Sequence, residues 1–257
     1  MKHFYQNPES ILITGTTSGL GYALALAYAR ENRTLFLWGR QEDKLLKIKK
    51  ECQKKGATVY TFCFDITDTQ QASDIVAEIE KIKPVDLVIA NAGVSKAKLG
   101  KHWQEATQNI FQTNVMGTVG TVLPVLSYMK KRNRGQIALI SSMAGFRGMP
   151  SCPAYSASKV CLKAWGEALR GSLKAKGIGV TVVCPGFIKT TLTDENTFKM
   201  PMIWSAKKAA GVIKKRLEKN PCLIAFPWPF LIAACLGSLL PASLFLWFSQ
   251  ILPKKEK

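Results

Sequence analysis

Short apolar runs alternate along the chain with longer stretches of helical pattern, from residue 10 to residue 225. Seven runs rich in Val, Ile, Leu and Phe predict strands at 11–14, 34–38, 58–64, 85–90, 135–141, 179–184 and 222–226. Each gap between them is long enough for a helix, and near-continuous apolar runs are typical of strands buried on both faces. The pattern predicts an α/β fold, a doubly wound parallel seven-stranded sheet with helices on both faces.

The end of the chain breaks this pattern. Residues 220–253 carry no charge and are dense in Leu, Phe and Trp. The apolar stretch exceeds the roughly 20 residues that cross a bilayer, but Pro241 divides it into two pieces of about 11 residues. We therefore predict a domain of residues 1–226 and an apolar C-terminal extension, 227–257, forming a bent interfacial or re-entrant hairpin.

The charge balance indicates an anionic partner. The 257 residues include 36 Lys and Arg against 17 Asp and Glu, a formal net charge of +19. Nucleic acid, an acidic membrane and a phosphorylated cofactor all carry the opposite charge, but 28 of the 36 basic residues are Lys. Lysines favour diffuse attraction over the bidentate reading of bases, so we expect no nucleic acid.

Cysteine and histidine usage argues against two further classes. The seven Cys include no C-x-x-C pair, and no His or carboxylate cluster has metal-ligand spacing. We expect neither a disulfide framework nor a metal. We expect the chain to reside in a reducing compartment. The N-terminus, MKHFYQNPES, lacks the apolar core of a secretory signal, so the chain is expected to start in the cytosol.

A glycine-rich turn follows the first predicted strand and precedes an Ala-rich helical stretch. Glycine lets backbone turn tightly and approach a pyrophosphate, and a helix N-terminus supplies free N–H groups. A tight turn without a ligand is the alternative. The residues of this predicted phosphate site are Gly15, Thr17, Ser18, Gly19, Leu20 and Gly21.

Tyr155 and Lys159 are four residues apart and so share one face of a helix. A side chain that gives or takes a proton in a reaction needs a suitable pKa, which a group beside it can adjust. A phenol has an ordinary pKa of about 10, and a nearby cation lowers it by roughly 1 to 3 units. The pair therefore predicts acid–base chemistry, with Lys159 lowering the pKa of Tyr155.

These motifs, taken together, resemble the short-chain dehydrogenase/reductase family over about residues 9–226. The resemblance rests on the G-x-x-x-G-x-G turn, on Asn91-Ala92-Gly93 after the fourth strand, and on Ser142 thirteen residues before Tyr155. It implies a Rossmann-type fold and an enzyme that interconverts a carbonyl and an alcohol with a nicotinamide cofactor.

The resemblance also implies a catalytic set of Asn114, Ser142, Tyr155 and Lys159. In that set Tyr155 is the general acid/base and Lys159 also holds the nicotinamide ribose. Ser142 bonds the carbonyl oxygen, and Asn114 holds a water that leads to bulk solvent. Each residue has a structural alternative: a strand end for Ser142, a helix bend for Asn114 and a solvated lysine for Lys159. The neighbouring Ser141 is the expected structural serine.

Further cofactor contacts follow from the same resemblance. Asp65 and Ile66 match the adenine site, although an Asp at a strand end is also a common helix cap. The segment Asn91, Ala92 and Gly93 lines the adenine and ribose side. The residues expected around the nicotinamide are Tyr155, Lys159, Pro185, Gly186, Ile188 and Thr190.

The end of the second predicted strand indicates which cofactor is preferred. An NAD enzyme needs a carboxylate there for the ribose 2′-OH, but this chain has Gly39-Arg40. A guanidinium can pair with a 2′-phosphate, so we predict NADP (NADPH) in preference to NAD. The alternative is a surface Arg40 paired with Glu42 or Asp43.

Residues 187–205 correspond to the substrate loop. Met200, Met202, Ile203 and Trp204 favour a small apolar, lipid-like carbonyl or alcohol substrate, although such side chains also serve in packing. The predicted function is an NADP-dependent oxidoreductase of lipid metabolism. The alternative is a non-catalytic NADP-binding sensor or scaffold at a membrane surface.

Lysines lie before and after the uncharged apolar stretch of 220–253, which favours attachment of segment 227–257 to the cytosolic side of a membrane as a peripheral or monotopic protein. The final Lys254-Lys255-Glu256-Lys257 looks like a retrieval signal of the endoplasmic reticulum, should the source be eukaryotic. Alternatively, the segment packs over the active site or against a second subunit in a homo-oligomer. The substrate and the direction of the reaction stay open.

Overall fold

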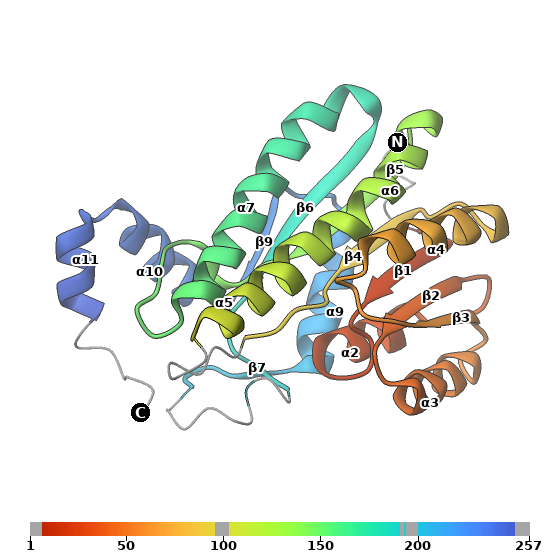
Figure 1. The fold of residues 1–257 in the computed structure, drawn as a ribbon, viewed down its shortest axis with the longest axis horizontal. Coiled ribbons are helices and arrows are strands. Elements are labelled where there is room, and N and C mark those ends of the chain that lie inside the picture. The colour runs from red at the N-terminus through yellow and green to blue at the C-terminus, as the bar shows by residue number, and fades with distance from the viewer. Residues whose placement is uncertain (1–6, 96–102, 191–192, 194–199, 250–257) are drawn as a thin grey trace.

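A parallel seven-stranded sheet forms the centre of the molecule (Figure 1). The computed structural model describes residues 7–95, 103–190, 193 and 200–249. Across the sheet the strands are β3 (Thr58–Cys63), β2 (Thr34–Gly39), β1 (Ser10–Thr14), β4 (Leu87–Ala90), β5 (Gly135–Ile140), β6 (Ile178–Pro185) and β9 (Leu223–Phe226). The seven predicted strands and the doubly wound topology are confirmed. The strand order reverses between β1 and β4, where such folds form a crevice.

Helices cover both faces of the sheet (Figure 1). One face carries α2 (Gly19–Tyr28), α3 (Glu42–Gln53) and α9 (Ala206–Leu217). The other carries α4 (Thr69–Ile82), α5 (Trp103–Phe111), α6 (Gly117–Arg132) and α7 (Pro153–Leu173). The shorter elements are the π-turn η1 (Gln112–Met116), the 3-10 turns η2 (Met143–Gly145) and η3 (Lys174–Lys176), and a two-stranded sheet of β7 (Ile188–Lys189) and β8 (Trp204–Ser205).

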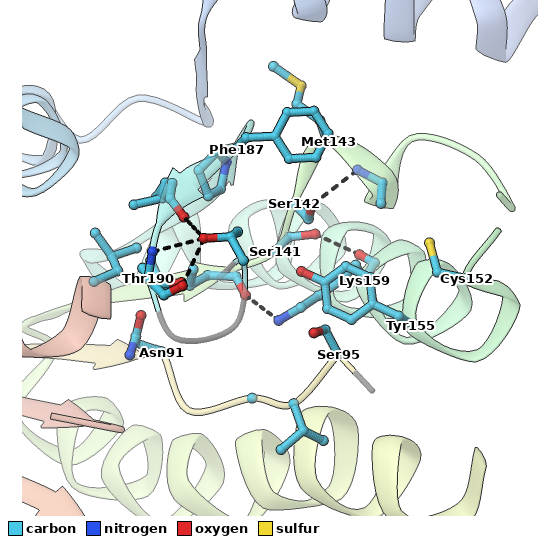
Figure 2. A pocket seen from close by; sticks show the side chains of 18 of the residues that line it. Asn91, Ser95, Ser141, Ser142, Met143, Cys152, Tyr155, Lys159, Phe187 and Thr190 are labelled. Carbon is cyan, nitrogen blue, oxygen red and sulfur yellow. Dashed lines mark hydrogen bonds between the residues drawn. The ribbon is translucent and has the colours of Figure 1, made fainter. Parts of the chain in front are cut away.

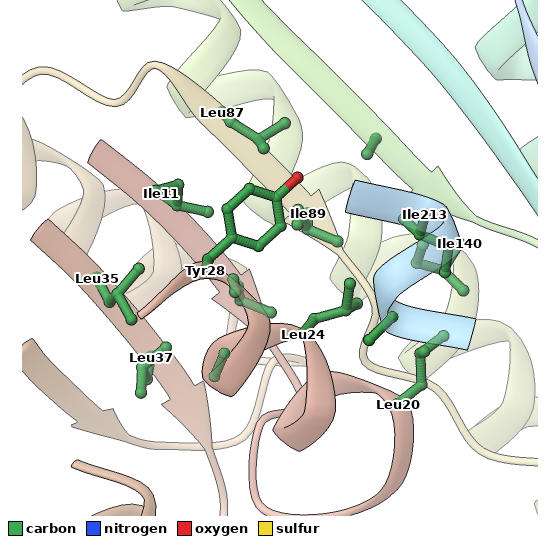
Figure 3. Packing of buried hydrophobic residues seen from close by; sticks show 14 of the residues in the cluster. Ile11, Leu20, Leu24, Tyr28, Leu35, Leu37, Leu87, Ile89, Ile140 and Ile213 are labelled. Atoms are coloured by element: carbon green, nitrogen blue, oxygen red, sulfur yellow. The ribbon is translucent and has the colours of Figure 1, made fainter. Parts of the chain in front are cut away.

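Alternation along each central strand feeds the two halves of the core. Ile11 and Ile13 pack with Leu24 and Tyr28 of α2 (Figure 3), whereas Leu12 between them faces the helices on the opposite side. All three isoleucine and leucine side chains of β1 are fully buried. Because burying one such side chain contributes about 1.5–3 kcal/mol, the apolar strands fix the sheet between its helices.

Strand β3 differs from the expectation that every strand is buried on both faces. Thr58, Tyr60 and Cys63 are exposed, and only Val59 is buried within the strand. The reason is position, since β3 lies at the edge of the sheet and pairs only with β2. Its alternating exposure is that of a strand with one face toward solvent.

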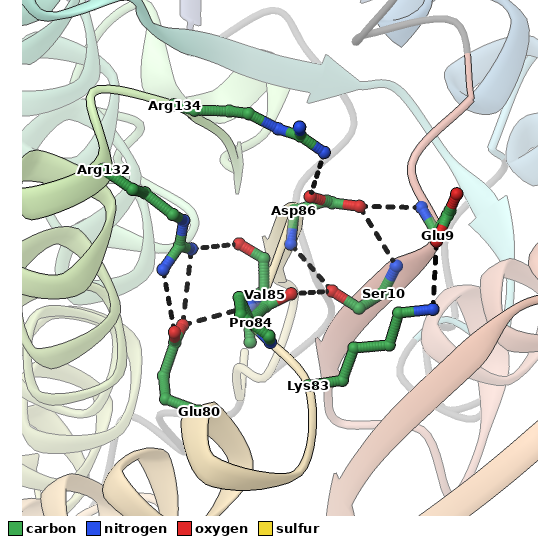
Figure 4. Close-up of polar contacts among 9 residues, drawn as sticks. All are labelled: Glu9, Ser10, Glu80, Lys83, Pro84, Val85, Asp86, Arg132 and Arg134. Carbon is green, nitrogen blue, oxygen red and sulfur yellow. Dashed lines mark hydrogen bonds and ion pairs between the residues drawn. The ribbon is translucent and has the colours of Figure 1, made fainter.

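Polar side chains join the elements at the amino ends of the strands (Figure 4). The buried carboxylate of Asp86 accepts hydrogen bonds from the backbone N–H groups of Glu9 (2.8 Å) and Ser10 (3.4 Å) and from Arg134 (3.1 Å). Arg132, at the end of α6, pairs with Glu80 of α4 at 2.7 Å. This end of the sheet is closed by pairing, which leaves the carboxyl ends of the strands for a site.

Two helices follow the sheet, α10 (Trp228–Leu239) and α11 (Ala242–Ser249). They are separated at Leu240 and Pro241, so the predicted break at Pro241 is confirmed. Figure 1 shows them in dark blue at the margin of the molecule, with α11 farthest from the sheet. Within the described ranges, no helix combines the length and the apolar character that crossing a membrane requires.

Candidate active site

The turn between β1 and α2 is built so closely that side chains do not fit. Gly15 and Gly19 have φ of +70° and +57°, which disfavours any residue with a Cβ. A Cβ on Gly21 would lie 2.1 Å from the Gly15 carbonyl oxygen, and one on Gly15 would lie 2.9 Å from the Cα of Ala92. The turn therefore presents bare backbone at the N-terminus of α2, an arrangement that fits a pyrophosphate.

Asn91 ties this turn to the end of β4. Its Nδ2 donates to the carbonyl oxygens of Thr14 (3.0 Å) and Gly15 (3.3 Å). The hydroxyl of Thr14 in turn accepts from the backbone N–H groups of Asn91 (3.0 Å) and Ala92 (2.9 Å). The Asn-Ala-Gly segment thus holds the crevice between β1 and β4 in one shape.

Ser142, Tyr155 and Lys159 meet beyond the end of β5 (Figure 2). Tyr155 and Lys159 lie on α7, which begins at Pro153, and the Ser142 side chain bonds that of Tyr155. The Lys159 ammonium lies 5.7 Å from the centroid of the Tyr155 ring and donates to the Ile140 carbonyl oxygen at 2.9 Å. The structure therefore brings these three predicted residues together in one place.

Burial, rather than charge attraction, governs the protonation of this pair. It raises the pKa of Tyr155 to about 12, although the hydrogen bond with Ser142 acts in the opposite direction. It also lowers the pKa of Lys159 to about 8. The expectation that Lys159 lowers the Tyr155 pKa is wrong for this structure, because desolvation of the phenolate outweighs an ammonium that points to Ile140. At neutral pH Tyr155 is a protonated donor.

Ser141 and Ser142 divide two roles. The Ser141 hydroxyl is buried and donates to the Lys159 carbonyl oxygen at 2.7 Å, so the predicted structural role of Ser141 is confirmed. Ser142 begins the turn η2, where its Oγ accepts from the backbone N–H of Ala144 at 3.1 Å. That bond ties the Ser142 side chain to the turn η2, beside Tyr155.

Asn114 is fully buried in the π-turn η1, behind the other three residues. Its Oδ1 accepts from the Val94 N–H at 2.8 Å, and its Nδ2 donates to the Val94 carbonyl oxygen (2.9 Å) and to Ser158 Oγ (3.0 Å). Both amide protons are thus used within the protein. Gly93 is close to this group, because a Cβ there would lie 3.1 Å from Asn114 Oδ1 and 3.4 Å from Lys159 Nζ. The side chain of Asn114 fixes the segment that borders Lys159.

Arg40 and Asp65 contact each other at the ends of β2 and β3. Arg40 Nη1 lies 3.2 Å from Asp65 Oδ2, with side chains 60% and 44% exposed. Partial burial acts to raise the Asp65 pKa, but bonds from Thr67 and Arg40 outweigh it and lower the pKa. The partner of Arg40 is therefore Asp65 and not Glu42 or Asp43. An exposed single-contact pair contributes about 0–1 kcal/mol, which leaves the guanidinium available to a stronger anion.

A cavity of about 1580 Å³ connects these parts. It exceeds the roughly 300–1,000 Å³ of a small-molecule site and so has room for a dinucleotide together with a substrate. Most predicted site residues line it: Gly15, Thr17, Ser18, Gly19, Leu20, Arg40, Ile66, Asn91, Ala92, Gly93, Ser142, Tyr155, Lys159, Pro185, Gly186, Ile188 and Thr190. Three predicted site residues are not part of this lining. Gly21 shapes the phosphate turn, Asp65 pairs with Arg40, and Asn114 holds Val94.

The segment after β6 closes the cavity from the side of α2. A Cβ on Gly19 would lie 2.9 Å from Thr190 Cγ2, so the phosphate turn and the Thr190 segment almost touch. The backbone N–H of Thr190 donates to Thr193 Oγ1 at 2.9 Å. Gly186 donates its N–H to the Phe226 carbonyl oxygen at 2.7 Å, which places the Pro185-Gly186 segment beside the start of α10.

The apolar wall of the cavity differs from the expected one. Met200, Met202, Ile203 and Trp204 are absent from the described lining, and Trp204 stacks on Phe226 with centroids 4.8 Å apart. Packing, the alternative for these side chains, holds for Trp204. The rest of the expected loop, 191–192 and 194–199, lies outside the described residues. Large apolar side chains that do line the cavity are Trp38 and Phe64 near Arg40, and Met143, Phe146, Met149, Phe187, Phe230, Phe245 and Leu246.

Arg147 holds the C-terminal helices over the cavity, a role that the sequence analysis missed. Its Nη1 donates to the carbonyl oxygens of Gly237 and Leu240, each at 2.6 Å, at the end of α10. Its guanidinium also lies 4.5 Å from the ring centroid of Phe245 in α11. Only its place five residues after Ser142 pointed toward the site. The sequence left two possibilities for segment 227–257, membrane attachment and packing over the active site or against a second subunit. The inner side of α10 and α11 packs over the cavity.

Comparisons with known proteins agree with this geometry. A family model described as short chain dehydrogenase matches residues 9–200. An uncharacterized oxidoreductase from Myxococcus xanthus is 36% identical over 240 residues, covering 92% of this chain and 94% of that protein. Ketoacyl reductase HetN from Nostoc is 32% identical over 218 residues, covering 82% and 76%. The solved structure of ElxO with NADP bound has a TM-score of 0.78 at 24% identity, covering 88% of this chain and 99% of that one.

Proposed function

The chain belongs to the short-chain dehydrogenase family and is an NAD(P)-dependent oxidoreductase, and on this basis we propose that it reduces the carbonyl group of an apolar substrate with NADPH. The observation that carries the proposal is the meeting of Ser142, Tyr155 and Lys159 in one cavity with the glycine turn. A proton donor and a dinucleotide cradle then serve the same enclosed space.

Tyr155 is the proposed general acid. With its pKa raised to about 12 by burial, it is protonated at neutral pH and can give its proton to the oxygen of a carbonyl under reduction. Ser142, bonded to Tyr155, would donate to the same oxygen and hold it in place. Lys159, whose burial lowers its pKa to about 8, is near the titration point at which a group passes protons on readily. When bound, NADPH supplies the hydride.

Arg40 is the proposed determinant of NADP preference. The phosphate turn, Asn91 and Thr190 would hold the dinucleotide, since the glycines leave bare backbone at the turn and Asn91 fixes its carbonyl groups. Arg40 stands at the end of β2 with no carboxylate in its own strand, and lines the cavity. A 2′-phosphate would compete with Asp65 for its guanidinium through charge-assisted bonds. The structural neighbour ElxO, solved with NADP bound, supports the same choice.

The apolar lining favours an apolar substrate. The end of the cavity that α10 covers is lined by Phe146, Phe187 and Phe230. The lining there includes no described carboxylate. The relative HetN is named a ketoacyl reductase, which supports an acyl-chain ketone as the first class to try. We therefore rank long-chain ketones and ketoacyl thioesters above small polar carbonyls.

The direct test is NADPH oxidation by the purified chain with a panel of ketones and aldehydes of rising chain length. The proposal expects turnover that improves with chain length. Tight NADPH binding without turnover on any substrate would overturn it and favour the non-catalytic sensor or scaffold. Improvement toward short polar carbonyls would overturn the apolar substrate alone.

Cofactor preference is tested with Arg40→Gln and Arg40→Asp. Loss of a charge-assisted contact worth about 1.5–3 kcal/mol should reduce the preference for NADPH roughly 10- to 100-fold in Arg40→Gln. Arg40→Asp should in addition improve the Michaelis constant for NADH, because a carboxylate accepts the ribose hydroxyl. Unchanged Michaelis constants for both cofactors in both variants would move the assignment to Thr17 or Ser18.

A further inference from the structure

Helix α10 is apolar on both of its sides. Phe230, Ala233, Ala234 and Gly237 follow helical spacing and line the cavity, so they form its inner face. The opposite face carries Trp228, Ile232, Leu236 and Leu239. A surface helix normally turns a polar face outward, and a helix that is apolar all round is normally enclosed. Yet α10 has no buried residue.

The outer face is strongly exposed. Trp228, Ile232, Leu236 and Leu239 are 71%, 51%, 61% and 80% exposed. Seven of the sixteen large hydrophobic side chains that the described residues leave exposed lie between Trp228 and Trp247, a stretch of 20 residues. We call the six of these that do not line the cavity the outer apolar face; they are Trp228, Ile232, Leu236, Leu239, Leu244 and Trp247. Such concentration marks a contact surface rather than the scattered apolar residues of an ordinary exterior.

Charge decides what covers this face. Two copies of a chain with a net charge of +19 repel each other, whereas an anionic lipid leaflet attracts each copy. We attribute the attraction to the net charge of the whole molecule, because not every lysine of α9 is directed toward the apolar stretch. Lys214, for example, donates to the Ala27 carbonyl oxygen in α2 at 2.7 Å.

The composition of the helix pair suits lipid as well. No charged residue occurs from 220 to 253, so burial of α10 and α11 in acyl chains removes no ion from water. Trp228 begins α10 and Trp247 lies near the end of α11, and tryptophan is enriched where membrane meets water. Neither described helix is long enough to span, which fits a pair lying in the plane of the interface.

We propose that α10 and α11 dock on an anionic lipid bilayer through the outer apolar face, so that the roof of the cavity lies in the membrane surface. The inner face of the same helix lines the cavity, and Arg147 fixes the pair in that place. Only one helix layer then separates lipid from the space beside Ser142 and Tyr155. This inference goes beyond the proposed reaction, and its test needs no turnover.

The test is co-sedimentation of the full chain with vesicles of phosphatidylcholine alone and of phosphatidylcholine with phosphatidylserine. We expect binding to the anionic vesicles, weakened by salt. The variant Leu236→Gln/Leu239→Gln should lower the partition coefficient at least about 100-fold without altering net charge. The matched control is Leu46→Gln/Leu123→Gln, which removes leucines 47% and 46% exposed on α3 and α6 and should bind as the wild type does.

Two further readouts complete the test. Lipids brominated in the acyl chain should quench tryptophan emission, and Trp228→Phe should lose more of that quenching than Trp103→Phe, on α5 at 53% exposure. Wild-type protein that stays in the supernatant with both vesicles overturns the proposal, as does equal binding by the double variant and its control. A vesicle-free dimer that Leu236→Gln/Leu239→Gln converts to monomer shows instead that a second copy covers the face.

Discussion

The sheet domain and the α10–α11 pair use apolar residues in opposite ways. In β1, Ile11, Leu12 and Ile13 are 0% exposed, and neighbouring strands bury their side chains as completely. In α10, Leu239 is 80% exposed and no residue is buried. The sheet domain therefore contains its own stabilising contacts. The helix pair lines the cavity on one side and exposes large apolar side chains on the other.

The same contrast extends to the polar groups. In the sheet domain, buried polar side chains such as Asn114 and Ser141 have hydrogen-bond partners at defined distances and set the geometry of Tyr155 and Lys159. Where the helix pair meets the domain, Arg147 donates hydrogen bonds to the end of α10, and contacts such as that of Phe230 with Phe187 are apolar. Polar contacts thus set the geometry around Tyr155 and Lys159, whereas largely apolar contacts hold the helices that cover the cavity.

The largest effect that separates the two regions is expected from Tyr155→Phe. It removes one oxygen, the proton donor, and little volume, so turnover should fall at least about 100-fold while NADPH binding stays nearly unchanged. By contrast, Leu239→Gln on the outer apolar face should leave turnover of a water-soluble ketone as in the wild type. Steady-state kinetics and cofactor titration measure both. Residual activity of Tyr155→Phe above about one per cent would remove it as the acid.

Glycine substitutions compare packing in the two regions. Gly21→Ala places a Cβ 2.1 Å from the Gly15 carbonyl oxygen, so it should destabilise the fold by about 1–3 kcal/mol and weaken NADPH binding. In α10, a Cβ on Gly237 would lie 3.5 Å from the Phe245 ring, an ordinary contact, and alanine favours the helix. Gly237→Ala should therefore be neutral or stabilising in urea unfolding. Equal losses in both variants would contradict the difference in packing.

The fold was readable because buried parallel strands are apolar runs of a length that helices do not share. The seven strands follow from that pattern, and the break between α10 and α11 follows from Pro241. What the pattern could not give was the exposure of β3, since edge position depends on strand order and not on the sequence of the strand. Strand order is set by crossovers among distant segments.

The site was readable only in part. Local motifs located the glycine turn and the Tyr155–Lys159 pair, because both are formed within one turn of chain. The pKa direction of Tyr155 was not readable, since it depends on burial by segments far away in the sequence. Arg147 had no motif, because its partners lie 90 and 93 residues further on. The apolar wall of the cavity likewise draws on segments far apart in the sequence, with Phe146 after β5, Phe187 after β6 and Phe230 in α10.

Arg147→Ala tests how far the polar contacts of Arg147 hold the helix pair on the domain. The variant loses two hydrogen bonds to the end of α10 and the contact with Phe245. We expect the chain to be cleaved several-fold faster by proteases at sites C-terminal to the start of α10. We also expect a several-fold higher Michaelis constant for a long-chain ketone and an unchanged Michaelis constant for NADPH. Arg147→Lys keeps the charge but not the forked set of N–H donors. Its rate of proteolysis and its Michaelis constant for the ketone should lie between those of the wild type and of Arg147→Ala. A raised NADPH constant would show that Arg147 supports the sheet domain instead.

The smallest effect is a slope of stability against pH that arises from Lys159 alone. Burial lowers its pKa to about 8, whereas an unfolded lysine titrates near about 10.4. Between these values the unfolded chain holds a proton that the folded chain has released, so the contribution of Lys159 to the free energy of unfolding rises with pH. Below about pH 8 both states are protonated and the cost of the buried ammonium is constant. One proton limits the slope to about 1.4 kcal/mol per pH unit.

The measurement is urea unfolding from pH 7 to pH 10 of the wild type and of Lys159→Met, with Lys163→Met as a control from the same helix. The free energy of unfolding of the wild type minus that of Lys159→Met should increase as pH rises. Tyr155 does not mask it, because a tyrosine whose pKa burial raises to about 12 acts only above about pH 10, and with the opposite sign. A difference independent of pH would mean that Lys159 is solvated in the folded protein. The sheet domain would then not bury this polar group, and the contrast with a helix pair that exposes apolar side chains would rest on the apolar residues alone.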